Sequence, residues 1–192
     1  MNPQRIAIKL YATRPIPREE LHPFIGVFHR FIQGASVPGL LIDVADYAHV
    51  PDGPGVILIG HEVDYGIDLV GGRTGLLTTR KRAGDLELSA LFRDALGKEL
   101  ATARALEADA DVAVRFAVDA IEVSFPDRLA APNTAIAFDR ACKELEPIAR
   151  AVFGAAARFE NANGSDARRM LTLRLAGDGA DLATKLARLE QR

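Results

Sequence analysis

Hydrophobic and polar positions along the chain change their period several times, and each period predicts an element. In the stretch RIAIKLYA, residues 5–12, every second side chain is large and apolar, which is typical of a half-buried β-strand. Residues 21–32 instead place apolar side chains three and four positions apart, as one face of an α-helix does. We therefore expect a strand near the beginning of the chain, followed by a helix from about Glu20 to Gly34.

A pair of glycines gives the clearest local signal. Residues 40–46 and 56–60 are short apolar runs joined by a loop rich in glycine and proline, so they indicate two antiparallel strands. In the next segment, 61–82, Gly71 and Gly72 lie between alternating strands, where a two-residue hairpin turn needs residues that tolerate positive φ. The cross-strand pairs expected from this turn are Ile67 with Leu76, Tyr65 with Thr78, Asp68 with Gly75, and Glu62 with Lys81.

A helix and an interrupted strand come next. A helical stripe starts after Asp85, a candidate N-cap, and ends near Ala108. Residues 112–118 carry apolar side chains at even positions and residues 120–125 at odd ones, and the change falls at Asp119. This pattern indicates two strands, or one long strand with a bulge.

From residue 119 onward the order of elements starts again. The second part repeats the strand, helix, strand, strand, helix series of the first part, which indicates an internal duplication of architecture. We therefore expect an α+β fold of two fused ferredoxin-like units with antiparallel sheets, residues 1–118 and 119–192, packed as one body. The hairpin 61–82 is inserted in the first unit. The elements expected in the second unit are a strand at 120–125, a helix at 132–152, strands near 156–160 and 169–175, and a final helix.

The stretch from Ile57 to Leu69 contains one histidine and three carboxylates. Both parities are apolar before Gly60 and only the odd parity is apolar after it, so we expect one long strand that bends at this glycine. The bend would gather the preceding loop and the polar residues of the strand around one cleft. The residues expected to bind a small polar molecule there are Tyr47, His49, Gly55, His61, Glu62, Tyr65 and Asp68.

An acid/base enzyme is the second interpretation of the same cleft. A histidine in an apolar row can act as a general acid or base, so His61 or His49 would move a proton while Asp68 orients the histidine or the substrate. Hydrolase, lyase and isomerase chemistry all stay open. The sequence carries no recognisable nucleotide-binding, serine-hydrolase or zinc motif, so it identifies neither a cofactor nor a metal site.

Other interpretations give the same residues a structural or an interaction role. The carboxylates can form a solvated face, with Glu62 balanced by Lys81 across the hairpin, and His61 can be a core histidine with a satisfied hydrogen bond. A third functional hypothesis is a homo-oligomer, such as a homodimer, that uses the hairpin 61–82 as a protruding arm. The apolar face of that arm, which includes Val63, would then need a cover.

Composition narrows the class of partner. The chain has 192 residues, of which 48% are hydrophobic, and a formal net charge of −2, so it can build a core but has no concentrated basic surface for nucleic acid. Cys142 is the single cysteine, which excludes an intramolecular disulfide. The first residues lack the apolar stretch of a signal peptide, and no window is apolar enough for a membrane span. We expect a cytoplasmic protein that binds neither nucleic acid nor membrane.

Overall fold

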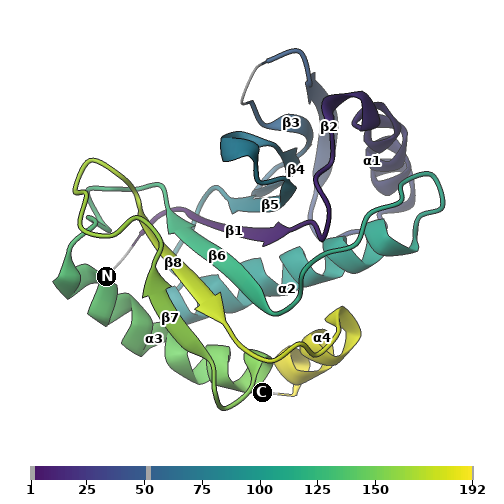
Figure 1. Cartoon of the computed structure of the whole chain (residues 1–192). Coiled ribbons are helices and arrows are strands. Elements are labelled where there is room, and N and C mark those ends of the chain that lie inside the picture. Colours follow the sequence, from purple (N-terminus) through teal and green to yellow (C-terminus); the bar gives the residue numbers. More distant parts are fainter. Residues whose placement is uncertain (1–2, 51–52, 192) are drawn as a thin grey trace.

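The computed structural model describes residues 3–50 and 53–191 and has an α+β fold. Within these ranges, eight strands form one antiparallel sheet in the order β2-β3-β4-β5-β1-β6-β8-β7, and there are four α-helices (Figure 1). The strands are β1 (Ile6–Tyr11), β2 (Leu41–Tyr47), β3 (Gly55–Gly60), β4 (Val63–Asp68), β5 (Gly75–Arg80), β6 (Ala120–Phe125), β7 (Arg158–Asn161) and β8 (Leu171–Ala176). The helices are α1 (His22–Gly34), α2 (Leu88–Ala108), α3 (Ala135–Phe153) and α4 (Leu182–Glu190), with short 3-10 segments η1 (Arg18–Glu20) and η2 (Val70–Gly72).

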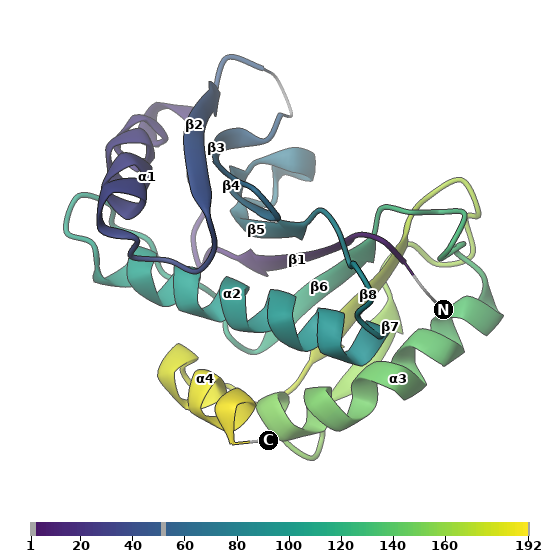
Figure 2. The ribbon, with the colours of Figure 1, turned by 180° about the vertical axis from the view of Figure 1, so that it is seen from behind.

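The helices cover one face of the sheet and leave the other face bare. The helix α1 contacts β2 and β3, α2 contacts β1 and β5, and α3 contacts β7 and β8, while α4 packs on α2 and α3. Figure 2 views the molecule from the side that α2 and α3 cover, and in Figure 1 α2 passes behind β1 and β6. Polar side chains on the opposite, helix-free face are therefore available to line a cleft. No helix in the described ranges is long and apolar enough to cross a bilayer.

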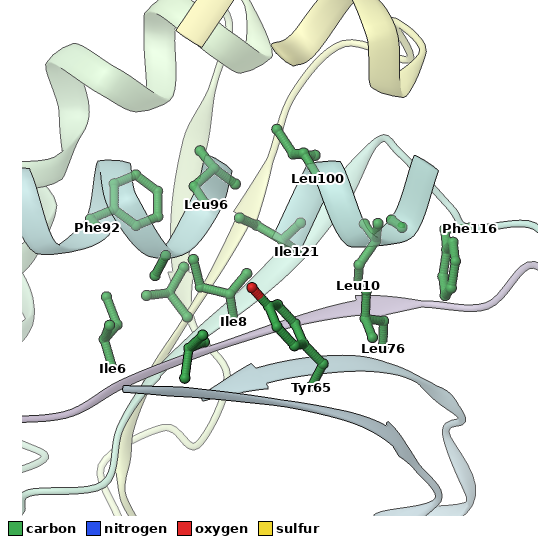
Figure 3. Close-up of a cluster of buried hydrophobic side chains, with 14 of the residues drawn as sticks. Ile6, Ile8, Leu10, Tyr65, Leu76, Phe92, Leu96, Leu100, Phe116 and Ile121 are labelled. Carbon is green, nitrogen blue, oxygen red and sulfur yellow. The ribbon is translucent and has the colours of Figure 1, made fainter. Parts of the chain in front are cut away.

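The alternation of side chains in β1 distinguishes the helix-covered face of the sheet from the helix-free face. Ile6, Ile8 and Leu10 are at most 1% exposed, and together with Phe92 and other residues they form the core between the sheet and α2 (Figure 3). Lys9 alternates with them and lies on the helix-free face. The strand that the sequence predicts over residues 5–12 is confirmed, and it lies in the middle of the sheet, between β5 and β6.

The hairpin of β4 and β5 has the expected register but not the expected position. Ile67 pairs with Leu76, and Asp68 pairs with Gly75, as predicted, but the two strands are joined by the loop 69–74, which contains η2, and not by a two-residue turn. However, β4 also pairs with β3, and β5 also pairs with β1, so both strands lie inside the sheet. Val63 is 1% exposed on the helix-covered face. The hairpin 61–82 is therefore not a protruding arm, and its apolar face is already covered.

The bend expected at Gly60 is a strand end and a chain reversal. The strand β3 stops at Gly60, β4 starts at Val63, and the two strands pair antiparallel with Leu58 opposite Tyr65. A Cβ atom at Gly60 would come within 2.3 Å of the carbonyl oxygen of Val63, so the close approach of the two strands requires glycine. Because the reversal changes the parity, Leu58 and Tyr65 share a face, whereas the single-strand interpretation places them on opposite faces.

The strand expected over residues 112–118 is an extended segment with one isolated bridge, between Ala12 and Phe116. The same edge of β1 then pairs with β6 in a shifted register, with Lys9 opposite Glu122. This shift agrees with the change of parity at Asp119 and with the bulge interpretation. The first part of the chain thus lacks the regular final strand that we expect from its sequence.

The helices follow their predicted stripes, with differences at their ends. Glu87 is the N-cap residue of α2 and forms no side-chain cap bond, so Asp85 does not cap this helix. Thr134 caps α3 by accepting a hydrogen bond from the backbone N–H of Ala137. Cys142 packs from α3 against the core, and burial raises the pKa of its thiol to about 11.

Candidate functional site

The two histidines of the predicted cleft lie at opposite ends of β3. His61 is exposed in the turn after β3, and its backbone N–H donates to the carbonyl oxygen of Leu40 at 2.8 Å. His49 is exposed in the loop before β3, where its ring stacks with that of Tyr47 at a centroid distance of 6.4 Å. A strand of six residues separates them by roughly 20 Å. The structure therefore forms no His49–His61 cleft, and His61 is not a core residue.

The remaining predicted residues are also dispersed. Tyr65 is buried on the helix-covered face and donates a hydrogen bond from its hydroxyl to the carbonyl oxygen of Pro38 at 2.6 Å. Burial raises the pKa of this phenol above its ordinary value. Gly55 has φ of 66° at the start of β3, and a Cβ atom there would come within 2.2 Å of the carbonyl oxygen of Ile67. Both positions are explained by packing.

Glu62 forms an ion pair, but its partner differs from the expected one. The Glu62 carboxylate accepts a hydrogen bond from Arg80, and this hydrogen bond lowers the pKa of the carboxyl. Lys81 instead pairs with Asp64 at 2.8 Å. The expected balance of Glu62 by Lys81 is therefore wrong. Their backbones do lie opposite each other, with a hydrogen bond of 2.8 Å from the Lys81 N–H to the Glu62 carbonyl oxygen.

Asp68 is the one predicted residue that lines a substantial cleft. The cleft encloses about 690 Å³ on the helix-free face of the sheet. Its floor comes from β1, β5, β6 and β8, and its walls come from the loops 69–74 and 162–170. This volume lies in the range that small-molecule sites occupy. Because β1 and β6 belong to different parts of the chain, both parts build this single cleft.

A buried ion pair lies on the floor of the cleft. The Nζ atom of Lys9 lies 2.5 Å from the Oδ2 atom of Asp68, and the two side chains are 11% and 7% exposed. Asp68 on β4 reaches Lys9 on β1 across the intervening β5, where the residue opposite Asp68 is Gly75. Lys9 itself lies opposite Leu77, so the pair crosses β5 diagonally, beside the position of Gly75, which has no side chain. A Cβ atom there would come within 2.3 Å of the Leu10 carbonyl oxygen.

A second charged group lies beside this pair. The guanidinium of Arg73 lies over the ring of Tyr11, 3.7 Å from its centroid, and its Nη1 atom lies 3.0 Å from the Oε1 atom of Glu122. Burial raises the pKa of Tyr11, and a hydrogen bond to Glu122 raises it further. Arg73 and Tyr11 therefore hold each other in a fixed arrangement on one wall of the cleft.

The wall formed by the loop 162–170, together with the adjoining floor from β6 and β8, carries hydroxyl and amide groups. The Oγ atom of Ser124 lies 3.0 Å from the Oγ1 atom of Thr172, which also accepts a hydrogen bond of 3.1 Å from the Nδ2 atom of Asn163. The Nη1 atom of Arg169 donates to the Oδ1 atom of Asn163 at 3.1 Å. These bonds connect β6, β8 and the loop 162–170, so the polar groups of this wall are fixed before any ligand arrives.

Another buried carboxyl lies on the helix-covered face. Glu99 of α2 is 0% exposed and accepts a hydrogen bond from the hydroxyl of Thr78 on β5. Its Oε1 atom has no hydrogen-bond partner in the described part of the chain. Burial raises the pKa of Glu99 well above its ordinary value, and the bond from Thr78 opposes that rise only in part. This carboxyl is enclosed in the core and does not line the cleft.

Sequence reasoning misses most of the cleft because its residues come from distant segments. Lys9 looks like the solvated side of a half-buried strand, and Arg73 and Ser124 belong to no motif. The one usable signal is the pairing of Asp68 with Gly75, which predicts a carboxylate beside a position with no side chain.

Comparisons with protein-family models, with curated proteins and with solved structures give no match for this chain. In the residues that the structure describes, no group of three His, Cys, Asp or Glu side chains is placed to hold a metal ion.

Proposed function

We propose that this protein is a cytoplasmic small-molecule-binding protein whose site is the cleft over β1 and β6. The observation that carries the proposal is the buried ion pair of Lys9 and Asp68 on the floor of a cleft of about 690 Å³. Buried ion pairs are costly to desolvate and add little stability, so their presence in a cleft favours a binding role. The fixed groups on both walls add directional contacts for a polar ligand.

A thermal-shift screen with small metabolites tests this proposal. A ligand at 100 times its dissociation constant should stabilise the protein by about 2.7 kcal/mol, which corresponds to a shift in Tm of about 5–10 °C for a chain of this size. Ala7→Leu places a larger side chain on the cleft floor and should abolish the shift. Ala135→Leu, at an exposed position of α3, is the matched control and should retain it. A hit that binds Ala7→Leu equally well would place the site elsewhere.

An acid/base enzyme is the second candidate, with Lys9 and Asp68 in place of the histidines. A lysine held by a carboxylate at the floor of a cleft can donate a proton to a bound substrate, and the carboxylate orients it. Turnover of a bound metabolite that is lost in Asp68→Asn, while the variant stays folded and binds the metabolite, would support this activity. Equal turnover in Asp68→Asn would exclude this role.

We also propose that the fold is a duplication of two ferredoxin-like units. Support comes from the element order, because β6, α3, β7, β8 and α4 follow the same series as β1, α1, β2, β5 and α2. In each series the first strand pairs with the last, and the two first strands pair antiparallel with Ile8 opposite Val123. The strands β3 and β4 are then an insertion in the first unit, and the cleft lies where the units meet.

A further inference from the structure

The charges around the cleft are unevenly compensated. Lys9 is paired with Asp68, and Arg73 is paired with Glu122. Arg169 lines the same cleft but forms no ion pair within residues 3–50 and 53–191. Its one hydrogen bond goes to a neutral amide oxygen, and a guanidinium has five N–H donors. The wall formed by the loop 162–170 therefore carries a net positive charge.

A neighbouring hollow extends this positive surface. It is lined by Arg128, Asn163, Arg168, Arg169 and Met170. Asn163, Arg169 and Met170 also line the cleft. Arg168 is paired with Asp166. Arg128 donates to the backbone carbonyl oxygen of Arg168 at 2.6 Å and, like Arg169, has no ion-pair partner in the described ranges. Two guanidinium groups that form no ion pair in the described ranges thus flank one end of the cleft, in a chain whose formal net charge is −2.

The rest of the cleft suits an uncharged body. Its other charges are already paired, and the hydroxyls of Ser124 and Thr172 offer neutral hydrogen-bonding groups. Leu77 and Val70 add apolar surface. A ligand that combines one oxyanion with a hydroxyl-bearing or partly apolar body would match both ends. Two guanidinium charges match a phosphate dianion better than a carboxylate.

We propose that the cleft binds a small phosphorylated molecule, with its phosphate held by Arg169 and Arg128 and its body over β1 and β6. This inference rests on the proposed small-molecule function and names the chemistry of its ligand. The phosphate group occupies the junction between the cleft and the hollow beside the loop 162–170, where Asn163 orients Arg169. The paired residues Lys9 and Asp68 contact the body of the ligand.

A titration with inorganic pyrophosphate, followed by the backbone amide signals of the isotope-labelled protein at constant ionic strength, tests the assignment. We expect the signals of Asn163, Arg169 and Thr172 to shift. Arg169→Gln and Arg128→Gln should each raise the dissociation constant by about tenfold or more, because each loses a charge-assisted contact. Arg150→Gln, an exposed arginine of α3 that is paired with Glu146, is the matched control and should leave the constant unchanged.

The outcomes separate this inference from the proposed function. If pyrophosphate shifts no signal of the cleft, or if Arg169→Gln binds it as well as the wild type, the phosphate assignment is overturned. An uncharged metabolite whose binding is blocked by Ala7→Leu but not by Arg169→Gln would overturn the assignment and leave the small-molecule function in place. An equal loss in Arg150→Gln would show nonspecific attraction of charge and would also overturn it.

Discussion

The two faces of the sheet each bury a carboxyl group, and they treat it differently. On the helix-free face, Asp68 lies 2.5 Å from the ammonium group of Lys9. On the helix-covered face, Glu99 has a hydroxyl as its hydrogen-bond partner and forms no ion pair in the described chain. Burial without a counter-charge favours the neutral acid, whereas a nearby cation favours the carboxylate. The helix-free face therefore pairs its buried carboxyl group with a cation, whereas burial in the core raises the pKa of the Glu99 carboxyl.

The largest effect is expected from removing one charge of the cleft pair. Asp68→Ala leaves the ammonium group of Lys9 buried without its partner, so it should lower the free energy of unfolding by about 3–5 kcal/mol. Urea denaturation measures this loss. The double variant Lys9→Met with Asp68→Leu removes both charges and should recover most of the stability. Neither variant should bind a cleft ligand as the wild type does, because both lack the charged pair on the cleft floor. A loss below about 1 kcal/mol in Asp68→Ala would contradict a tightly coupled pair.

Glu99, the carboxyl on the helix-covered face, should make the free energy of unfolding depend on pH. Because burial raises the pKa of Glu99 in the folded state, its stabilising contribution is complete below the unfolded pKa of about 4.3 and is lost as the pH rises through the folded value. The free energy of unfolding should fall by up to about 1.4 kcal/mol per pH unit in that interval. Glu99→Gln lacks this slope, so its stability relative to the wild type should increase with pH.

Denaturation curves of the wild type and Glu99→Gln between pH 4.5 and pH 8 measure the difference. Thr78→Val removes the hydrogen bond that opposes the rise, so it should extend the sloping interval to higher pH. Parallel pH profiles for the wild type and Glu99→Gln would show that Glu99 does not change its protonation on unfolding in this range. That result would contradict the difference proposed between the two buried carboxyl groups.

A substitution at Tyr65, on the helix-covered face, should lower stability slightly without changing ligand binding. Tyr65→Phe removes the hydroxyl that donates to the carbonyl oxygen of Pro38 and should cost about 0.5–1.5 kcal/mol. The dissociation constant for a cleft ligand should stay unchanged, because the hydroxyl lies on the far side of the sheet from the cleft. If Tyr65→Phe binds the cleft ligand more weakly while its Tm is unchanged, Tyr65 contributes to binding and this prediction is wrong.

The smallest effects are expected at the two exposed histidines, which belong to neither buried group. His61→Ala and His49→Ala should each change the free energy of unfolding by less than about 0.5 kcal/mol. Both variants should also retain the thermal shift of a cleft ligand. Loss of that shift in His49→Ala or in His61→Ala would show that the loop before β3 or the turn after it takes part in binding, and would contradict the cleft as the complete site.

Local signals predicted the elements well, and long-range pairing explains what they missed. The register of β4 and β5 was predicted from Gly71 and Gly72, which have φ of 71° and 69° and lie within the loop 69–74 that connects the two strands. The reversal between β3 and β4 carries His61 and Glu62, which are not typical turn residues, so periodicity suggested one long strand.

The candidate site was predictable only through Asp68. Its pairing with Gly75 depends on the same local turn and was correct. Lys9 faces the cleft because β1 lies between β5 and β6, and β6 is more than a hundred residues away along the chain. No pattern within β1 distinguishes a lysine in solvent from one that pairs with a distant carboxylate, and the same holds for Ser124.

The position of β1 has a consequence for how the chain is made. This strand is synthesised before the other strands of the sheet, yet one of its neighbours, β6, is completed only at Phe125. Until then, a nascent chain that has already joined β1 to β5 exposes the unpaired backbone groups of β1 along one edge. Between the emergence of β5 and that of β6, this edge of β1 is therefore open to pairing with other chains.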